Sequence, residues 1–445
     1  MKIPSDDQFN NQLSIESSGQ PRTFYWHYAW VIVSIAAVVQ MVGASIRMAF
    51  GVFIDPLSDS FGWSQGSITL AYAINSIVSA LFSPAAGWVA DKYGTRKALA
   101  IGALIFVFGM FVTGVVNQLW QFYLAFGLLL GIAQAIFLVP LVPGVMRWYK
   151  RQLGWGMGIM MASWGVGPAI SAPLLGYMIV HLDWRGTFWA TAIGSSVIMV
   201  ILIYLYRDSP SDIGVDAYGT LPQDPVEEEF AVDQAKNKIF VGHMKKTAAY
   251  YNLSSIHFLG CVGHAVILVY LIPIAVMQGL SIIEGAAILT VMSAISVPSR
   301  LLVPVLSEKF GVRTVMAIFF FMQGITVIML FWTHDQWMFY VFAVVFGIGY
   351  GGESGAFPIL NRIYYGHAPQ GSPYGFQMLG AGLGMAFGGW IGGAIFDITQ
   401  GYGIALAISV VASLVGMVSI MCLERTDKLL IPDWQLKHST NQSNR

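Results

Sequence analysis

The stretch Asp91-Lys-Tyr-Gly-Thr-Arg96 has a relative 217 residues later in the chain, Glu308-Lys-Phe-Gly-Val-Arg313. A second pair is offset by 215 residues: Pro143-x-x-x-Arg147-x-Tyr149 and Pro358-x-x-x-Arg362-x-Tyr364. Each of these four stretches comes at the end of a long apolar run. Two matched pairs at nearly one offset indicate a duplicated unit. Parallel repeats of this kind are a transporter architecture in which the substrate site lies near the midplane, between the repeats.

The composition predicts a helical membrane protein. Of the 445 residues, 56% are hydrophobic and only 10% are charged, whereas soluble domains have about 25% charged residues. Many apolar runs reach the ~18 residues that cross a bilayer core as a helix. The formal net charge of zero gives no basic surface for nucleic acid.

Twelve apolar runs, six on each side of a polar segment, predict an all-α membrane protein of two six-helix halves. We expect a cytoplasmic tail at 1–24, the first half at 25–206, a linker at 207–250, the second half at 251–423 and a tail at 424–445. The expected helices cover about 28–54, 66–90, 97–116, 119–145, 153–180, 186–206, 251–277, 284–306, 313–333, 336–360, 372–397 and 402–423. A short surface helix is expected near 232–243.

The distribution of basic residues predicts the orientation. If both tails are cytoplasmic, the inner segments hold 20 of the 23 Lys and Arg residues. Of the other three, only Arg185 falls in an outer loop. This bias toward the inner side is the pattern of multi-pass membrane proteins. We expect a cell-membrane protein, of a bacterial inner membrane, with both termini in the cytoplasm.

Arg300 lies inside an apolar run, where an arginine at the bilayer centre costs roughly 2.5–3.5 kcal/mol on the insertion scale. Such residues usually face a cavity or a partner. The residue one turn earlier is Ser296, so the helix itself supplies no acid. We interpret Arg300 as the binding group for a substrate anion, and a structurally paired or snorkelling arginine is the alternative.

Three further charged or titratable positions fall within apolar runs. Arg47 could face the cavity as a second fixed positive charge, or pair with Asp55 or Asp59 at the outer surface. Glu353 could be the protonation site of a proton-coupled cycle, could pair with Arg300 when substrate is absent, or could sit among glycines in simple helix packing. His264 could bind substrate or titrate near neutral pH, or be a hydrogen-bonded packing residue.

Polar and aromatic residues on helices expected near the cavity complete the candidate substrate site. Each of them is also an ordinary structural residue of a helix bundle, and we expect two or three to touch substrate. They are Asn75, Gln134, Trp164, Tyr270 and Gln377. The two cysteines, Cys261 and Cys422, indicate neither a disulfide framework nor a metal site, and no cofactor is expected.

The loop Gly87-Trp-Val-Ala-Asp91-Lys-Tyr-Gly94-Thr-Arg96-Lys97 resembles the conserved cytoplasmic loop motif of the major facilitator superfamily. The resemblance covers about 28–423, and the copy with Glu308 and Arg313 extends it to the second half. In physical terms, Gly87 allows close helix approach. Asp91 and the cations after it could form a charge lock between the halves, although Arg96 and Lys97 also fit plain inner-face anchoring.

Within that superfamily, the chain resembles the monocarboxylate porters and the oxalate–formate exchangers. Arg47-Met-Ala-Phe-Gly-Val-Phe53 is similar to a segment where animal members carry lysine, and Trp148 to Gly158 is similar to the entry of their fifth helix. Arg300 matches the arginine that holds a substrate carboxylate in this family. The chain departs from the family at Ser296, where animal members carry aspartate. It also departs at Arg47, because an arginine cannot relay a proton.

These features predict a secondary transporter of small organic anions, most directly a short 2-hydroxy or 2-oxo monocarboxylate, coupled to proton symport or anion exchange. A dicarboxylate or sulfonate carrier that uses both Arg47 and Arg300 is the alternative. A membrane anion sensor is the alternative from another class. An enzyme is not expected, because neither a His-Glu-x-x-His pair nor a Gly-x-Ser-x-Gly turn occurs.

Overall fold

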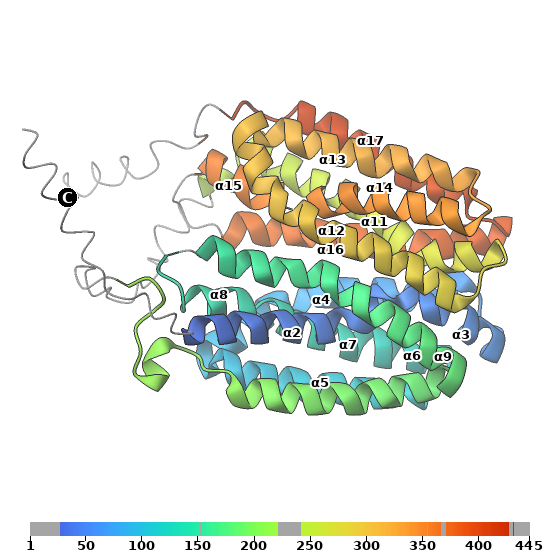
Figure 1. Cartoon of the computed structure of the whole chain (residues 1–445), viewed down its shortest axis with the longest axis horizontal. Helices are drawn as coiled ribbons and strands as arrows, with labels where there is room; N and C mark the ends of the chain where they lie inside the picture. The colour runs from blue at the N-terminus through green and yellow to red at the C-terminus, as the bar shows by residue number, and fades with distance from the viewer. Residues whose placement is uncertain are drawn as a thin grey trace, which may run out of the picture.

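A computed structural model describes residues 27–151, 153–220, 242–353, 355–365, 371–426 and 430. The predicted surface helix near 232–243 and the tail at 1–24 fall mostly or wholly outside these ranges. Figure 1 shows two bundles side by side, one formed by the first half of the chain and one by the second. We call the end that holds Tyr28 and residues 206–220 the linker end, and the end that holds Asp55 and Asp397 the far end.

The first half crosses the membrane six times. The first pass is formed by α2, η1 and α3, and the fourth by α6, the π-helical segment η2, α7 and α8. The bounds are α2 Tyr28–Met48, η1 Phe50–Phe53, α3 Ile54–Phe61, α4 Gln65–Tyr93, α5 Thr95–Gly114, α6 Leu119–Phe122, η2 Tyr123–Leu129, α7 Leu130–Leu138, α8 Leu141–Met146 and α9 Leu153–Leu205.

The long helix α9 makes two passes because it folds back at Asp183, where φ is 60° and ψ is −178°. Figure 1 shows its second limb returning beside α5. The Asp183 carboxylate accepts a 2.9 Å hydrogen bond from the backbone N–H of Gly186, as an N-cap residue does. Arg185 donates to the Gly114 carbonyl and to Asn117. These contacts give the turn a structural role.

The second half also has six passes, preceded by the linker residues 206–220, which contain the 3-10 turn η3 (Pro210–Ile213). α13 and η4 form one pass, and α14 and α15 form another. The bounds are α11 Ala248–Met277, α12 Ile282–Phe310, α13 Val312–Val327, η4 Ile328–Phe331, α14 Gln336–Glu353, α15 Ala356–Tyr365, α16 Gly371–Thr399 and α17 Gly403–Met421.

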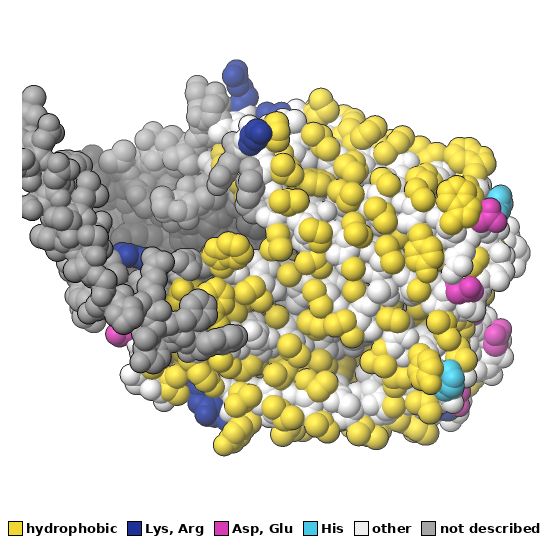
Figure 2. Space-filling view, viewed as in Figure 1, with side chains coloured by type: hydrophobic (Ala, Val, Ile, Leu, Met, Phe, Trp, Pro, Cys, Tyr) yellow, Lys and Arg dark blue, Asp and Glu magenta, His cyan; other side chains and the backbone are white. Residues whose placement is uncertain are grey.

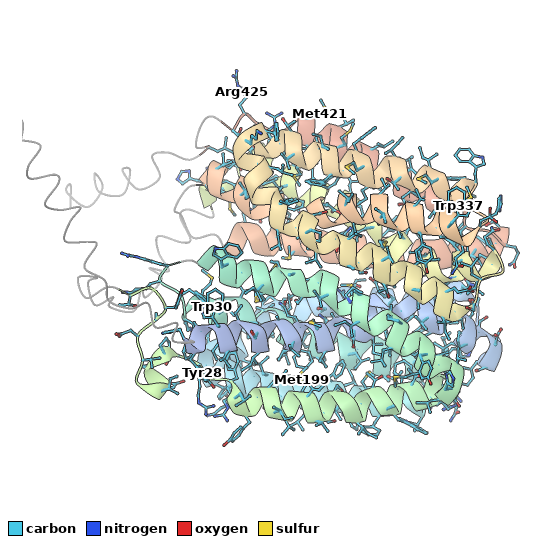
Figure 3. All side chains as sticks on the ribbon, viewed as in Figure 1. Tyr28, Trp30, Met199, Trp337, Met421 and Arg425 are labelled. Atoms are coloured by element: carbon cyan, nitrogen blue, oxygen red, sulfur yellow. The ribbon has the colours of Figure 1, made fainter. Side chains whose placement is uncertain are left out.

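The fold is the predicted one, an all-α membrane protein with twelve transmembrane helices. Within the described residues, ten helices are long and apolar enough to span a membrane. One of the ten is the two-pass helix α9, and α14 with α15 completes the set. Figure 2 shows hydrophobic side chains over the middle of one face, with Lys and Arg mainly toward the linker end. Tyr28 and Trp30 lie near the linker end and Trp337 lies at the far end (Figure 3), as interfacial aromatic residues do.

The duplicated stretches perform the same structural task in each half. Gly94 and Gly311 precede α5 and α13 with φ values of 91° and 82°, a conformation that favours glycine. Arg96 donates to the Tyr204 carbonyl at the end of α9. Arg313, 217 residues later, donates to the Met421 carbonyl at the end of α17. The last carbonyls of a helix have no partner within it, so each arginine fastens the last helix of its half.

The two halves meet along α4 with α16, α9 with α12, and η1 with α11. At the far end, Asp397 of α16 accepts a 2.9 Å hydrogen bond from the Gly66 N–H of α4. Tyr402 donates to Gln65 Oε1 at 2.5 Å. The far end is therefore joined by polar contacts between the halves.

Candidate functional site

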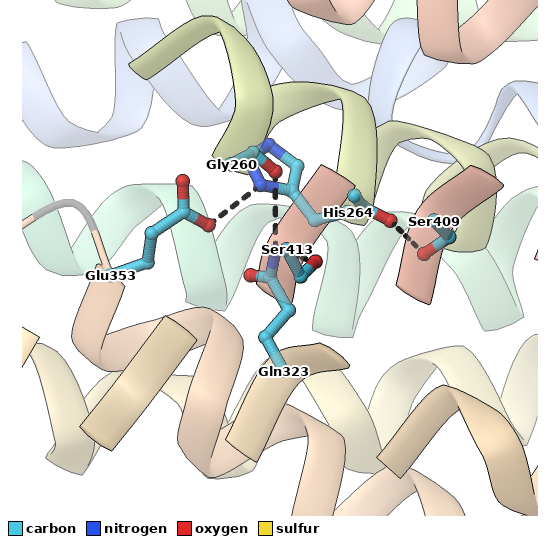
Figure 4. A network of polar contacts seen from close by, with 7 residues as sticks. Gly260, His264, Gln323, Glu353, Ser409 and Ser413 are labelled. Carbon is cyan, nitrogen blue, oxygen red and sulfur yellow. Dashed lines mark hydrogen bonds and ion pairs between the residues drawn. The ribbon is translucent and has the colours of Figure 1, made fainter. Parts of the chain in front are cut away.

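A buried histidine and glutamate face each other near the middle of the second half. His264 on α11 and Glu353 on α14 place Nδ1 and Oε2 2.9 Å apart (Figure 4). Their side chains are 11% and 2% exposed. Gly260, one turn before His264, lets the carboxylate approach, because a Cβ at this position would overlap Glu353 Oε1. None of the three alternatives given for Glu353 above included this contact with His264.

Hydrogen bonds from Gln323 and Ser409 join α11 to the neighbouring helices α13 and α17 around this pair. Gln323 on α13 donates to the Gly260 carbonyl at 3.2 Å and to Ser413 Oγ at 3.1 Å. Ser409 on α17 donates to the Gly263 carbonyl at 2.6 Å. Figure 4 shows these contacts on the side of α11 that faces α13 and α17. The network holds α11 in place, so that His264 stays against Glu353.

Arg300 contacts the ring of Tyr350, and this ring in turn contacts His264. Its guanidinium carbon is 4.9 Å from the centre of the Tyr350 ring, within the range of a cation–π contact. The Tyr350 ring centre is in turn 5.0 Å from that of His264. The arginine is therefore close to buried groups of the second half.

Arg47 lies on α2 in the first half. Its Nη1 is 3.5 Å from Ser76 Oγ, a long hydrogen bond, and its Nε is buried without a hydrogen-bond partner among the described residues. The alternative of pairing with Asp55 or Asp59 is not realised. Gln65 contacts Asp55 instead, with Nε2 and Oδ1 3.4 Å apart. Arg47 borders a small pocket of about 10 Å³ with Asn75 and Gln134.

Tyr72 on α4 connects the two arginine regions. It is 1% exposed, and its hydroxyl has no hydrogen-bond partner in the described part of the chain. It lies near Arg47, Tyr350 and Cys261. The groups around Arg47 and those around Arg300 therefore meet across the boundary between the halves.

The structure brings together Arg47, Asn75 and Gln134 at one pocket, and Arg300, His264 and Glu353 at one cluster. It does not bring the other candidates into either group. Tyr270 donates to the Gly389 carbonyl at 2.5 Å and accepts from Gly393 N–H at 2.7 Å. Gln377 exchanges two 2.9 Å hydrogen bonds with Asn361. Trp164 is half-buried on α9, next to Gly165, which packs on α12.

The loop motif differs in detail from expectation. A Cβ at Gly87 would lie 3.5 Å from Val139, an ordinary contact, so packing does not require glycine there. Asp91 and Lys97 are exposed. Arg96 bonds to its own half rather than forming a lock between halves, because the end of α9 offers it unpaired carbonyls. The Glu308 side chain lies outside the described residues.

Sequence reasoning missed Tyr72, Tyr350 and Cys261 as members of the site. Atoms of Cys261, His264 and Glu353 that could bind a metal lie within 4.8 Å of one another. The charge of Arg47 reaches Cys261, and that of Arg300 reaches Tyr350 beside it. Two fixed positive charges make this region better suited to an anion than to a cation. A tyrosine or cysteine in an apolar run carries no signal of such a position.

Comparisons with known proteins agree with this architecture. A family model described as the Major Facilitator Superfamily matches residues 33–376 and 253–438. The chain belongs to the Major Facilitator Superfamily. Among solved structures of this fold, a POT family transporter in complex with 5-aminolevulinic acid superposes with a TM-score of 0.67 at 13% identity, over 92% of this chain and 98% of that one. A bacterial homologue of the lysosomal transporter Spinster, inward-facing and unoccupied, gives 0.63 at 16% identity, covering 96% and 99%.

The sequence relatives of this superfamily member are transporters. The oxalate:formate antiporter of Oxalobacter formigenes is 22% identical over 87% of this chain and 89% of its own. Human monocarboxylate transporter 2 is 21% identical over 74% and 71%. Bovine monocarboxylate transporter 13 is 25% identical over 36% of this chain, and the match spans 37% of that relative. The chain is therefore a membrane transport protein and not an enzyme, as predicted.

Proposed function

We infer that the protein is a secondary transporter of small organic anions, most directly monocarboxylates, that works by alternating access. The observation that carries this inference is Arg47. Its guanidinium has no acidic partner among the described residues, and its Nε is buried without a hydrogen bond. A buried positive charge is costly unless an anion compensates it. A substrate carboxylate supplies that charge, and a planar guanidinium binds it through two parallel hydrogen bonds.

Arg300 contributes from the opposite half. With Arg47 on α2 and Arg300 on α12, one anion can contact both halves at once. Its arrival then favours the state in which the halves are close around it, and rocking of the halves exposes it to either side. The basic residues concentrated on the linker side support an orientation with both termini in the cytoplasm. A bacterial inner membrane fits the similarity to the antiporter of Oxalobacter formigenes.

The His264–Glu353 pair is the candidate coupling group. A carboxylate and an imidazole in contact can share and release one proton as the halves move, which would couple transport to proton symport. Anion exchange is the alternative mechanism. Uptake driven by an inward proton gradient supports symport, whereas uptake that ignores the gradient but is accelerated by internal anion decides for exchange.

Two guanidinium groups, those of Arg47 and Arg300, also suit a doubly charged substrate. A dicarboxylate or sulfonate carrier is therefore the second candidate. Competition between matched mono- and di-acids of the same chain length separates the two substrate classes.

The test is uptake of labelled short-chain acids into proteoliposomes. Arg300→Lys and Arg47→Lys should each lower the uptake rate at least about tenfold, because lysine cannot make the paired hydrogen bonds. The matched control is Arg185→Lys at the far end, which should transport at the wild-type rate. Wild-type uptake by both site variants, with equal reconstitution, would overturn the proposed function.

A further inference from the structure

The π-helical segment η2 exposes a backbone carbonyl to another helix. In an α-turn, the Leu130 N–H would bond to Phe126 O, but here it bonds to Ala125 O, five residues back. Asn75 on α4 occupies the position beside this carbonyl, and its Nδ2 donates to Phe126 O at 2.9 Å. Such π-helical turns occur frequently at functional sites.

This hydrogen bond fixes the orientation of the Asn75 amide. A carbonyl oxygen only accepts hydrogen bonds, so the amino group must be the atom that faces Phe126 O. The Asn75 carbonyl oxygen, Oδ1, therefore points elsewhere. It is buried and accepts no hydrogen bond from the described residues. Asn75 is 2% exposed, and leaving a buried acceptor unsatisfied is costly.

Asn75 lines the small pocket beside Arg47. The pocket measures about 10 Å³, and its other walls come from four helical elements of the first half. Its lining residues are Gly43, Ile46, Arg47, Asn75, Phe106, Phe126, Leu130 and Gln134. Such a volume holds about one non-hydrogen atom. Two of its lining residues, Asn75 and Arg47, each keep a buried polar atom, Oδ1 and Nε, without a hydrogen-bond partner among the described residues.

We propose that this pocket is the subsite for a hydroxyl group on C2 of a short carboxylic acid whose carboxylate binds Arg47. The hydroxyl donates to Asn75 Oδ1 and fills the space of one atom. A 2-oxo group would place a second acceptor against Oδ1, and an unsubstituted acid would leave Oδ1 buried and unpaired. The subsite therefore selects 2-hydroxy acids. This inference rests on the proposed function, because Arg47 must hold the carboxylate.

The experiment is titration calorimetry of the purified full-length protein with lactate, pyruvate and propionate. These acids share a three-carbon frame and differ only at C2. The wild-type protein should bind lactate at least about tenfold more tightly than either of the others. Asn75→Leu, which is similar in size but lacks the acceptor, should bring the three affinities to within about twofold of one another. Ser79→Ala, one turn further along α4, should keep the wild-type preference.

Each other outcome counts against the subsite. Equal affinities of the wild-type protein for the three acids overturn the subsite alone and leave the anion transporter standing. A lactate preference that persists in Asn75→Leu also overturns the subsite alone. Binding of none of the acids overturns the subsite together with the monocarboxylate function. The comparison of acids on the wild-type protein is decisive even if the Asn75 variant does not fold.

Discussion

Asp397 of the second half accepts a 2.9 Å hydrogen bond from the backbone N–H of Gly66, the second residue of α4 in the first half. The first N–H groups of a helix have no partner within it, and the helix dipole favours an anion there. Asp397 thus caps a helix of the opposite half. The proposed alternating-access mechanism requires the halves to separate at this end, and under it the contact stabilises one of the two states.

Asp397→Ala should shift the equilibrium toward separation at the far end. Loss of a capping carboxylate costs about 0.5–2 kcal/mol, which changes the ratio of the two states by roughly two- to thirtyfold. The measurement is the distance distribution between spin labels at Asp59 and Ile398, both exposed, in a cysteine-free background. Asp335→Ala, at an exposed aspartate of the same end, is the control. An unchanged distribution in Asp397→Ala would contradict this role.

Glu353→Gln should uncouple transport from the proton gradient. The amide keeps the size of the side chain but cannot take up a proton. Under proton symport, we expect an inward proton gradient to lose its accelerating effect, while exchange of internal for external anion continues within about threefold. Acceleration of the variant by the gradient, equal to wild type, would remove Glu353 from the coupling step.

Gly351→Ala should destabilise the helix contact that carries Arg300. A Cβ at Gly351 would lie 2.7 Å from the Cα of Ser296 on α12 and would overlap the Ser296 carbonyl. Backbone atoms cannot move aside cheaply, so overpacking of this kind costs typically 1–3 kcal/mol. Thermal unfolding in detergent should show a lower midpoint. Gly194→Ala, where a Cβ meets nothing within 4 Å, should match or exceed wild-type stability, and equal loss in both variants would contradict the packing argument.

Arg96→Ala and Arg313→Ala should destabilise the protein by similar amounts. Each removes a charged donor from the final carbonyls of α9 or α17, and such a bond contributes about 1 kcal/mol after allowance for solvent. Lys97→Ala, at an exposed neighbour, is the control. If only the Arg96 variant loses stability, the two repeated stretches do not share one structural role.

The helices were predictable because the hydrophobicity of many consecutive residues adds up along each membrane-spanning segment. Runs of ~20 apolar residues and repeated loop sequences leave few alternatives for a membrane protein. Each half therefore has its six expected passes. The breaks within the first and fourth passes were not predictable, since the π-helical turn at Phe126 depends on a side chain from another helix, Asn75.

The site was predictable only where residues are costly in a membrane. Four ionisable residues stand out because a charge inside a membrane is costly and is usually kept for a function. They are Arg47, His264, Arg300 and Glu353. Their partners do not follow from the sequence. Pairing of Glu353 with His264 rather than with Arg300 depends on the close approach of α14 to Gly260. Tyr72 lies between the two arginine regions, but a tyrosine in an apolar helix is an ordinary packing residue.

The central claim is that two fixed guanidinium groups, one from each half, hold an organic anion between the bundles. Equilibrium binding of a panel of short mono- and dicarboxylic acids to purified wild-type protein, Arg47→Gln and Arg300→Gln tests it most directly. We predict saturable binding of at least one acid to the wild-type protein and a loss of at least about tenfold in affinity in each variant. Equal affinity in all three proteins, or the absence of acid binding to the wild-type protein, would contradict the account.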